Sequence, residues 1–97
     1  MGNEYFVYIM TNKYNTVLYT GVTNDLMRRL SEHKEGIGGI FTRRYRINKL
    51  IYYESYEDIH LALSREKQIK GGSRQKKIDL VKSSNQNWID LYEEVYE

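Results

Sequence analysis

EYFVYIM, at residues 4–10, is the stretch that decides the fold. It is aromatic and β-branched and has no polar face, which is typical of a strand that is covered on both sides. A polar, turn-like segment at residues 11–16 leads to a second short stretch, VLYTG, at residues 17–21. Two strands joined by a short polar loop most simply form an antiparallel hairpin. The chain is therefore expected to build its sheet around this hairpin.

Capping and stop signals divide the rest of the chain into helices and one more strand. Ser55 and Asp58 form an S-x-x-D capping pattern, and Ser73 is a good N-cap. The first expected helix runs from Asn24 or Asp25 to Gly36, with Leu26, Leu30, His33 and Ile37 at helical spacing, and a strand follows at 50–53. A second helix is expected from Ser55 or Tyr56 to the glycines at 71–72, and a third from 73 to 83. A last helix is expected to begin at Asn85 or Asn87 and to carry Trp88, Leu91, Tyr92 and Val95. This β-β-α-β-α-α-α order predicts a small α/β (α+β) domain with a three-stranded, mostly antiparallel sheet flanked by helices.

Length and composition narrow the class of protein. A chain of 97 residues is expected to form one domain, residues 1–97, with one modest core. The absence of Cys excludes disulfides, thiol nucleophiles and Cys-based zinc sites, and two His do not make a typical structural zinc site. No apolar run approaches the ~20 residues of a membrane span, and we expect no signal peptide and a cytoplasmic protein.

Glu66 breaks the helical pattern around it. At about 100° per residue it shares a face with Ile59 and Leu63, with Ala62 and Ile69 close by. A buried carboxylate is costly unless it is paired or binds a metal. Two interpretations stay open: a functional carboxylate, or a structural one that is paired or lies at the helix edge.

Four other side chains stand out on the first helix and on the hairpin. Arg29 and His33 are four residues apart, so their side chains are neighbours beside the apolar stripe, whereas Arg28 points away. Tyr8 and Tyr19 lie on adjacent strands, where each is compatible with a core position whose hydroxyl reaches the rim. Taken singly, each of these residues has an ordinary structural explanation.

The net charge of +2 hides a patchy distribution. Residues 28–49 and residues 65–82 each carry seven Lys/Arg against two acids, while residues 83–97 carry four acids and no base. Basic stretches interleaved with Phe41 and Tyr45 suit a phosphate backbone, although a solvated helix face has the same composition.

The chain resembles the GIY-YIG nuclease superfamily, and in particular its small single-domain bacterial members, which are related to the N-terminal nuclease domain of UvrC. Residues 6–8 (FVY) match the first motif, residues 19–21 (YTG) the second, residues 23–33 the helix with the arginine and histidine, and residues 62–67 the segment with the metal-binding glutamate. Phe6 replaces the usual Gly of the first motif, Val22 follows Gly21 where some members carry Lys, and Gln86 replaces the Pro that usually follows Asn85.

The resemblance implies that Tyr8, Tyr19, Arg29, His33 and Glu66 are catalytic residues, with Glu66 as the ligand of one Mg²⁺ or Mn²⁺ ion. It implies a metal-dependent endonuclease that cuts DNA, with branched, nicked or single-stranded DNA in repair or recombination as expected substrates. Residues expected to bind nucleic acid are Arg28, Lys34, Arg43, Arg44, Arg46, Lys70, Arg74, Lys76 and Lys77.

We expect DNA as the partner, nucleoid association when DNA is bound, a targeting protein as a further partner, and neither a membrane nor a small-molecule cofactor. The alternative functions are a nucleic-acid-binding module with weak or no catalysis that a partner recruits, and an interaction protein that uses the acidic C-terminal segment around Trp88 and Tyr92.

Overall fold

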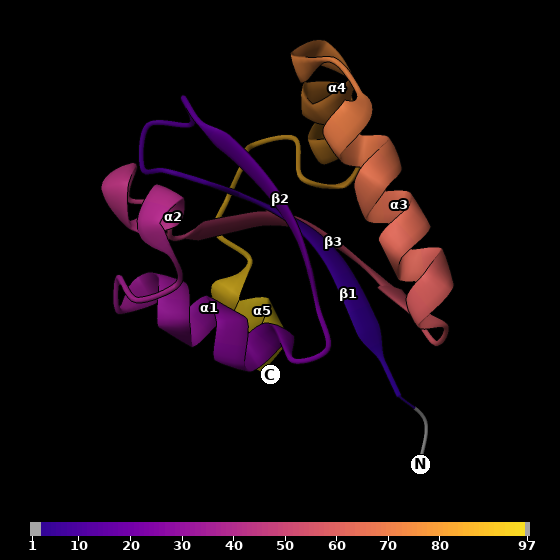
Figure 1. The fold of residues 1–97 in the computed structure, drawn as a ribbon. Helices are drawn as coiled ribbons and strands as arrows, with labels where there is room; N and C mark the ends of the chain where they lie inside the picture. The colour runs from indigo at the N-terminus through magenta and orange to yellow at the C-terminus, as the bar shows by residue number, and fades with distance from the viewer. Residues whose placement is uncertain (1–2, 97) are drawn as a thin grey trace.

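The computed structural model describes residues 3–96 as an α+β domain. Figure 1 shows a sheet with helices on both sides. In chain order the elements are β1 (Tyr5–Thr11), β2 (Leu18–Thr23), α1 (Leu26–Lys34), α2 (Ile40–Arg44), β3 (Lys49–Tyr56), α3 (Ile59–Gly71), α4 (Arg74–Ser84) and α5 (Tyr92–Tyr96).

The three strands form one antiparallel sheet in the order β2-β1-β3. The predicted hairpin is confirmed: Tyr8 lies opposite Gly21, and Met10 lies opposite Tyr19. On the other side of β1, Tyr8 lies opposite Tyr53, and the register shifts between Ile9 and Met10. The first strand is therefore central, as its unbroken apolar sequence predicts.

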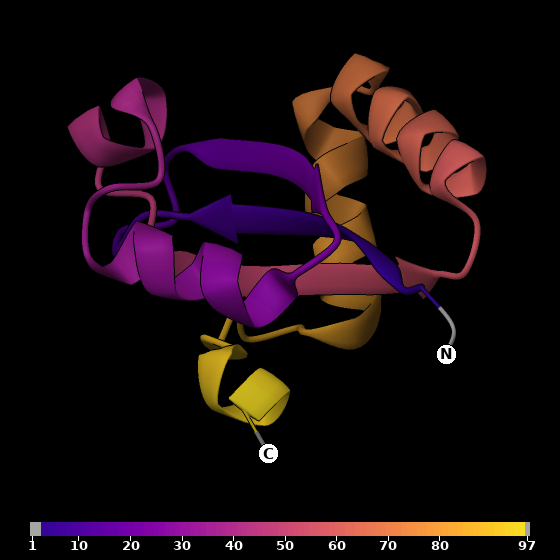
Figure 2. The same cartoon turned by 60° about the horizontal axis from the view of Figure 1, so that its bottom comes forward.

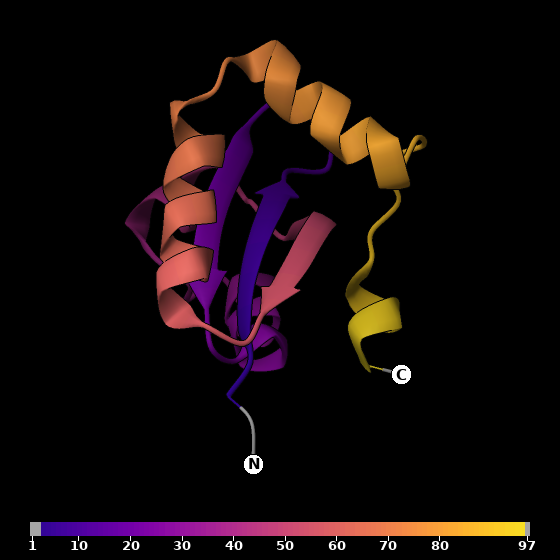
Figure 3. The same cartoon turned by 90° about the vertical axis from the view of Figure 1, so that its right-hand side faces the viewer.

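Two apolar layers cover the two faces of the sheet, because successive side chains of a strand point to opposite faces. Val7 and Ile9 pack with Ala62 of α3 and Val81 of α4. Tyr8 and Met10 point the other way and pack with side chains of α1 and of the C-terminal segment. Figures 2 and 3 show α3 and α4 on one side of the sheet and α1 and α5 on the other.

Several helix ends agree with the sequence signals. Asp25 caps α1, because its side chain accepts a hydrogen bond from the Arg28 backbone amide, and Ser73 caps α4 by accepting from the Lys76 amide. Leu26, Leu30 and His33 are buried as expected, but Ile37 is exposed because the helix ends before it.

Two predicted boundaries are wrong, and one short helix was not predicted. Ser55 lies within β3, and Asp58 caps α3 instead, since the strand continues for three residues beyond the apolar run that predicted it. A short helix, α2, forms in the basic stretch, where the sequence analysis predicted no helix. The last helix is limited to Tyr92–Tyr96, because Asn85 ends α4 and Trp88 has a positive φ of 55°.

The segment between α4 and α5 runs along the outer edge of β3. The Leu91 amide donates to the Leu50 carbonyl at 2.8 Å, and the Leu50 amide donates to the Asp90 carboxylate at 3.2 Å. In the part of the chain that the structure describes, β2 pairs only with β1, so its other edge carries no strand. Within the same residues, no helix is long and apolar enough to cross a bilayer.

Candidate active site

Tyr8 is the most buried residue of the candidate site, with 2% of its surface exposed. Its ring lies across Gly21 of the neighbouring strand, so closely that a Cβ at Gly21 would overlap the ring and its hydroxyl. Gly21 therefore lets the Tyr8 side chain reach over the edge strand β2. Burial, followed by Tyr19, raises the pKa of Tyr8 well above its ordinary value, while Arg29 opposes that shift.

Tyr19 and His33 complete an aromatic cluster around Tyr8. Ring centroids are 6.4 Å apart for Tyr8 and Tyr19, 6.4 Å for Tyr8 and His33, and 6.0 Å for Tyr19 and His33. Tyr19 also stacks on Phe41 of α2 at 6.2 Å. The cluster thus continues from the sheet interior to the surface of α2, where half of Phe41 is exposed.

His33 is held as a neutral ring. Burial, helped by the charge of Arg29, lowers its pKa below the ordinary value. Neither ring nitrogen has a hydrogen-bond partner of good geometry, although the Ile47 backbone lies close enough to favour the protonated form. Gly38 packs on the ring, since a Cβ there would lie 2.8 Å from Nδ1.

Arg29 lies on the inward side of α1, as predicted, while Arg28 is exposed. Its Nε atom is buried without a hydrogen-bond partner and lies 3.8 Å from the Glu32 carboxylate. Its charge lowers the pKa of both Tyr8 and His33, so it lies within electrostatic reach of both. Buried polar atoms without partners are rare in folded proteins, and three of those in the described residues belong to Arg29 and His33 on α1.

Glu66 lies on α3, on the opposite side of the sheet edge from α1, and 17% of its side chain is exposed. The predicted apolar face around it is only partly correct: Ala62 and Ile69 are buried, whereas Ile59 and Leu63 are exposed. The Lys70 ammonium pairs with its carboxylate at 2.9 Å. The charge of Glu66 raises the pKa of Tyr8, which places the carboxylate within electrostatic reach of the cluster.

Two hollows flank β2 next to these residues. A cleft of about 340 Å³ is lined by Leu18, Tyr19, Thr20, Phe41, Lys70 and Lys77. A smaller one of about 250 Å³ is lined by Tyr5, Val22, Thr23, Asn24, Arg29 and Ile59. The five predicted catalytic residues are related through Tyr8: the rings of Tyr19 and His33 neighbour its ring, and the charges of Arg29 and Glu66 act on its hydroxyl.

The predicted nucleic-acid-binding residues divide into two groups. Arg28, Arg43, Arg44, Arg46 and Lys76 are exposed, and so is Lys70, which pairs with Glu66. Three others have partners within the chain: Lys34 pairs with Asp90 and lies over the Tyr92 ring, Arg74 donates to the Thr16 carbonyl, and Lys77 donates to the Lys70 and Gly72 carbonyls. Lys34 faces the acidic C-terminal segment, so we do not include it in the proposed DNA surface.

The ligand atoms available at the site suit a hard cation that keeps most of its bound water molecules. No group of three or more His, Asp or Glu residues that could hold a metal ion is found within residues 3–96. Mg²⁺ is commonly held by one or two carboxylates together with substrate phosphates. The half-buried Glu66 carboxylate fits that requirement, whereas a zinc site would need more protein ligands.

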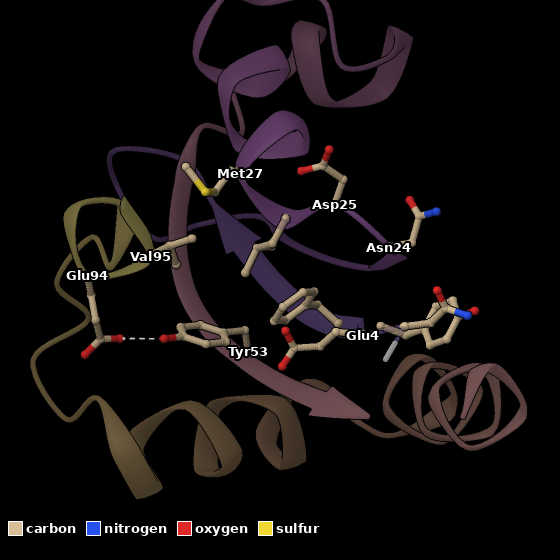
Figure 4. A pocket seen from close by; sticks show the side chains of 11 residues that line it. Glu4, Asn24, Asp25, Met27, Tyr53, Glu94 and Val95 are labelled. Carbon is tan, nitrogen blue, oxygen red and sulfur yellow. Dashed lines mark hydrogen bonds between the residues drawn. The ribbon is translucent and has the colours of Figure 1, made fainter. Parts of the chain in front are cut away.

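A larger cavity, of about 610 Å³, lies elsewhere, between β1, β3, α1 and α5. Figure 4 shows it with Glu4, Asp25 and Glu94 around it, and with Tyr53 donating to Glu94. Among the described residues that line this cavity, none is Lys or Arg. Its negative charge does not suit a phosphate backbone.

Asn85 has a structural role. It is 6% exposed, and its amide donates to the carbonyls of Ile51 and Ile89 and accepts from the Ile89 amide. These bonds tie the segment after α4 to β3. The asparagine lies among the core of the sheet and not at the candidate site.

Comparison with known proteins identifies the class. The GIY-YIG catalytic domain family model matches residues 4–79, and the chain belongs to this nuclease domain family. It is similar over most of its length to UPF0213 proteins, a group of small single-domain relatives.

A UPF0213 protein of Clostridium perfringens is 39% identical over 95% of this chain and 92% of its own length. One from Pediococcus pentosaceus is 37% identical over 92% of this chain and 93% of its own. The solution structure of a UPF0213 protein from Bacillus halodurans is 30% identical, covers 90% of this chain and 92% of its own, and superposes with a TM-score of 0.58.

Proposed function

We propose that this protein is an endonuclease that hydrolyses DNA phosphodiester bonds with one Mg²⁺ or Mn²⁺ ion bound at Glu66. The observation that carries the proposal is the convergence of Tyr8, Tyr19, Arg29, His33 and Glu66 at one sheet edge, with polar atoms of Arg29 and His33 that lack partners. Groups left unsatisfied in the fold are available to a substrate.

Each residue has a role that follows from its surroundings. Arg29 binds the phosphoryl oxygens and stabilises the charge that develops there. The neutral His33 accepts a proton or orients a water molecule, because its lowered pKa keeps a lone pair available at neutral pH. Tyr19 contacts both Tyr8 and His33 and positions the attacking water.

Burial raises the pKa of Tyr8 and outweighs the opposing charge of Arg29, which favours a proton relay through the Tyr8 hydroxyl over a phenolate in the metal-free fold. Tyr8 therefore orients the attacking water and passes a proton along the cluster, and any phenolate depends on positive charge beyond Arg29. A cation held by Glu66 supplies Lewis-acid stabilisation of the phosphate and of the leaving oxygen.

Unpaired or distorted DNA is the substrate form that the surface favours. Phe41 and Tyr45 have ring centroids 4.8 Å apart and are 49% and 40% exposed, next to Arg43 and Arg44. Aromatic side chains beside cations stack on bases that have left a duplex. Branched, nicked and single-stranded DNA offer such bases, and intact duplex does not.

The alternative is a DNA-binding module with weak or no catalysis that a protein partner recruits. The domain itself offers little surface for DNA beyond the site, which favours a partner for targeting. The complete set of five site residues favours catalysis.

The experiment compares wild type and Glu66→Gln on labelled duplex, flap, nicked and single-stranded DNA, with and without Mg²⁺ or Mn²⁺. We expect metal-dependent products from wild type alone, with similar DNA binding by both proteins in low salt. Equal cleavage by both would exclude the single-metal scheme. No metal-dependent cleavage of any substrate would favour the binding module.

A further inference from the structure

The carboxylate expected to hold the cation already has a cationic partner. The Lys70 ammonium lies 2.9 Å from the Glu66 carboxylate, four residues further along α3. The two side chains differ in exposure: 17% for Glu66 and 54% for Lys70. The inner group is thus the carboxylate, and the outer group is a long, flexible side chain.

We propose that Lys70 holds the place of the divalent cation at Glu66 and exchanges with it, so that the displaced ammonium binds a phosphate of the DNA in the cleft beside Tyr19. This inference rests on the proposed function, because it takes Glu66 as the cation ligand. It assigns Lys70 two successive partners, a carboxylate of the protein and a phosphate of the substrate.

The surroundings of Lys70 permit the exchange. Ion pairs at this helical spacing with an exposed partner are weak, and a lysine ammonium is a compact charge on a freely rotating stem. Lys70 already lines the cleft of about 340 Å³ together with Tyr19, Phe41 and Lys77. The displaced ammonium therefore needs only a rotation of its own side chain to reach a phosphate there.

Lys77, the other lysine of the cleft, is held differently. Its ammonium donates to the Gly72 carbonyl at 2.6 Å and to the Lys70 carbonyl at 3.3 Å, so it closes the end of α3. Moving it would leave those carbonyls without their charged donor. Between the two lysines, Lys70 is the one suited to exchange.

The exchange also makes cation binding and DNA binding cooperative. The Glu66–Lys70 pair is neutral as a unit, and a divalent cation on the same carboxylate leaves a local charge of about +2. Arg29, across the sheet edge, acts on Tyr8 as Glu66 does and adds to this charge. Phosphate is therefore bound more tightly once the cation is in place, and by linkage DNA tightens the cation.

The test measures Mn²⁺ binding directly, by the loss of the free-ion electron paramagnetic resonance signal, with and without a non-cleavable phosphorothioate DNA. We expect Lys70→Met to bind Mn²⁺ about 3-fold more tightly than wild type without DNA, because the competitor is gone. We also expect this variant to lose most of the DNA-induced increase in Mn²⁺ affinity.

Lys67→Met is the matched control. It removes the same charge from the residue next to Glu66. Lys67 lies on a different side of α3, where it lines a separate hollow with Gly71 and Leu80. We expect its Mn²⁺ affinity and its response to DNA to match wild type.

The outcomes separate the inference from the function on which it rests. If Glu66→Gln binds Mn²⁺ as wild type does, Glu66 is not the cation ligand and the proposed function fails. If Glu66→Gln loses Mn²⁺ binding while Lys70→Met behaves like Lys67→Met, the exchange alone is overturned.

Discussion

Glu54 and Glu66 are two carboxylates with nearly equal exposure, 16% and 17%, and opposite surroundings. Glu54, on β3, accepts hydrogen bonds from the hydroxyls of Tyr52 and Tyr56 and from the Arg65 guanidinium, whose Nη2 atom is 2.9 Å away. Every bond that a carboxylate of this kind needs is supplied by the fold itself.

Glu66 is paired instead with one exposed cation, Lys70, and its charge reaches Tyr8, whose pKa is raised mainly by burial. The groups across the sheet edge from it, Arg29 and His33, contain buried nitrogen atoms without hydrogen-bond partners. Burial alone does not distinguish a structural carboxylate from a functional one. The two kinds of carboxylate differ in how completely the fold supplies their hydrogen bonds, and the following predictions test that difference.

The largest effect is expected when Glu66 and Glu54 are each changed to glutamine and DNA cleavage is compared. Glu66→Gln should lower metal-dependent cleavage by more than about 100-fold, because Lewis-acid stabilisation is worth several kcal/mol. Its melting temperature should change by less than about 4 °C, because the lost pair with Lys70 is weak. Glu54→Gln should show the reverse: a clear loss of stability, with cleavage retained at low temperature. Equal loss of activity in both would refute the distinction.

The next effect concerns Gly21, which brings Tyr8 to the Glu66 side of the sheet. Gly21→Ala places a methyl group within the Tyr8 ring and hydroxyl, so we expect a loss of about 2–3 kcal/mol in the free energy of unfolding, and cleavage below that of wild type in the folded protein. Gly71→Ala is the control, because its added methyl group meets no atom within 4 Å and helical alanine is favourable. Urea unfolding measures both variants.

Glu54 should also give an acid-dependent contribution to stability. Burial alone would raise its pKa, but the hydrogen bonds from Arg65, Tyr52 and Tyr56 hold the pKa below its ordinary value of 4.5. A carboxylate with a lowered pKa stabilises the fold above its ordinary pKa and loses that contribution as the pH falls. Glu54→Gln should therefore cost about 2 kcal/mol at pH 7 and progressively less below pH 4.5. A cost independent of pH would show that the charge of Glu54 is not what stabilises the fold.

The smallest expected effect is that of His33 on the pH dependence of stability. Its pKa is lowered by burial and by Arg29, so the unfolded chain binds the proton more tightly. The free energy of unfolding should then fall as the pH drops below 6.5, the ordinary pKa of histidine. The slope should be less than about 1.4 kcal/mol per pH unit, which is the limit for a single titrating group. His33→Gln should remove this slope between pH 7.5 and 5.5 in thermal melts, while the exposed His60→Gln should keep it.

The sequence predicted the elements with a strong local pattern. The apolar run of β1 and the caps at Asp25 and Ser73 depend on neighbouring residues, and the structure confirms them. The predicted start of the last helix was wrong, because the conformation of the segment after Asn85 depends on a hydrogen bond to Ile51, far away in the chain. Local periodicity carries no information about such a contact.

For the candidate site, the sequence and the family resemblance pointed to residues but not to their protonation states. Glu66 stood out because a carboxylate interrupted apolar neighbours, even though Ile59 and Leu63 proved exposed. The raised pKa of Tyr8 follows from a ring lying over Gly21, which no spacing along one strand reveals. The packing of Gly38 on His33 was missed as well, and the glycine-rich loop after α1 was the only signal for it.

The two edge strands of the sheet differ in how far they are protected from pairing with a second copy of the protein. The backbone of β3 is protected on its outer side by residues 90 and 91, whereas β2 leaves hydrogen-bonding groups without a strand partner. Such a border invites a strand of a second molecule, and lysines beside it oppose that by mutual repulsion. Lys70 and Lys77 lie there, so under the proposed function the lysines that would bind a polyanion would also oppose the pairing of two copies. Variants that neutralise these lysines will need more dilute handling than the wild type.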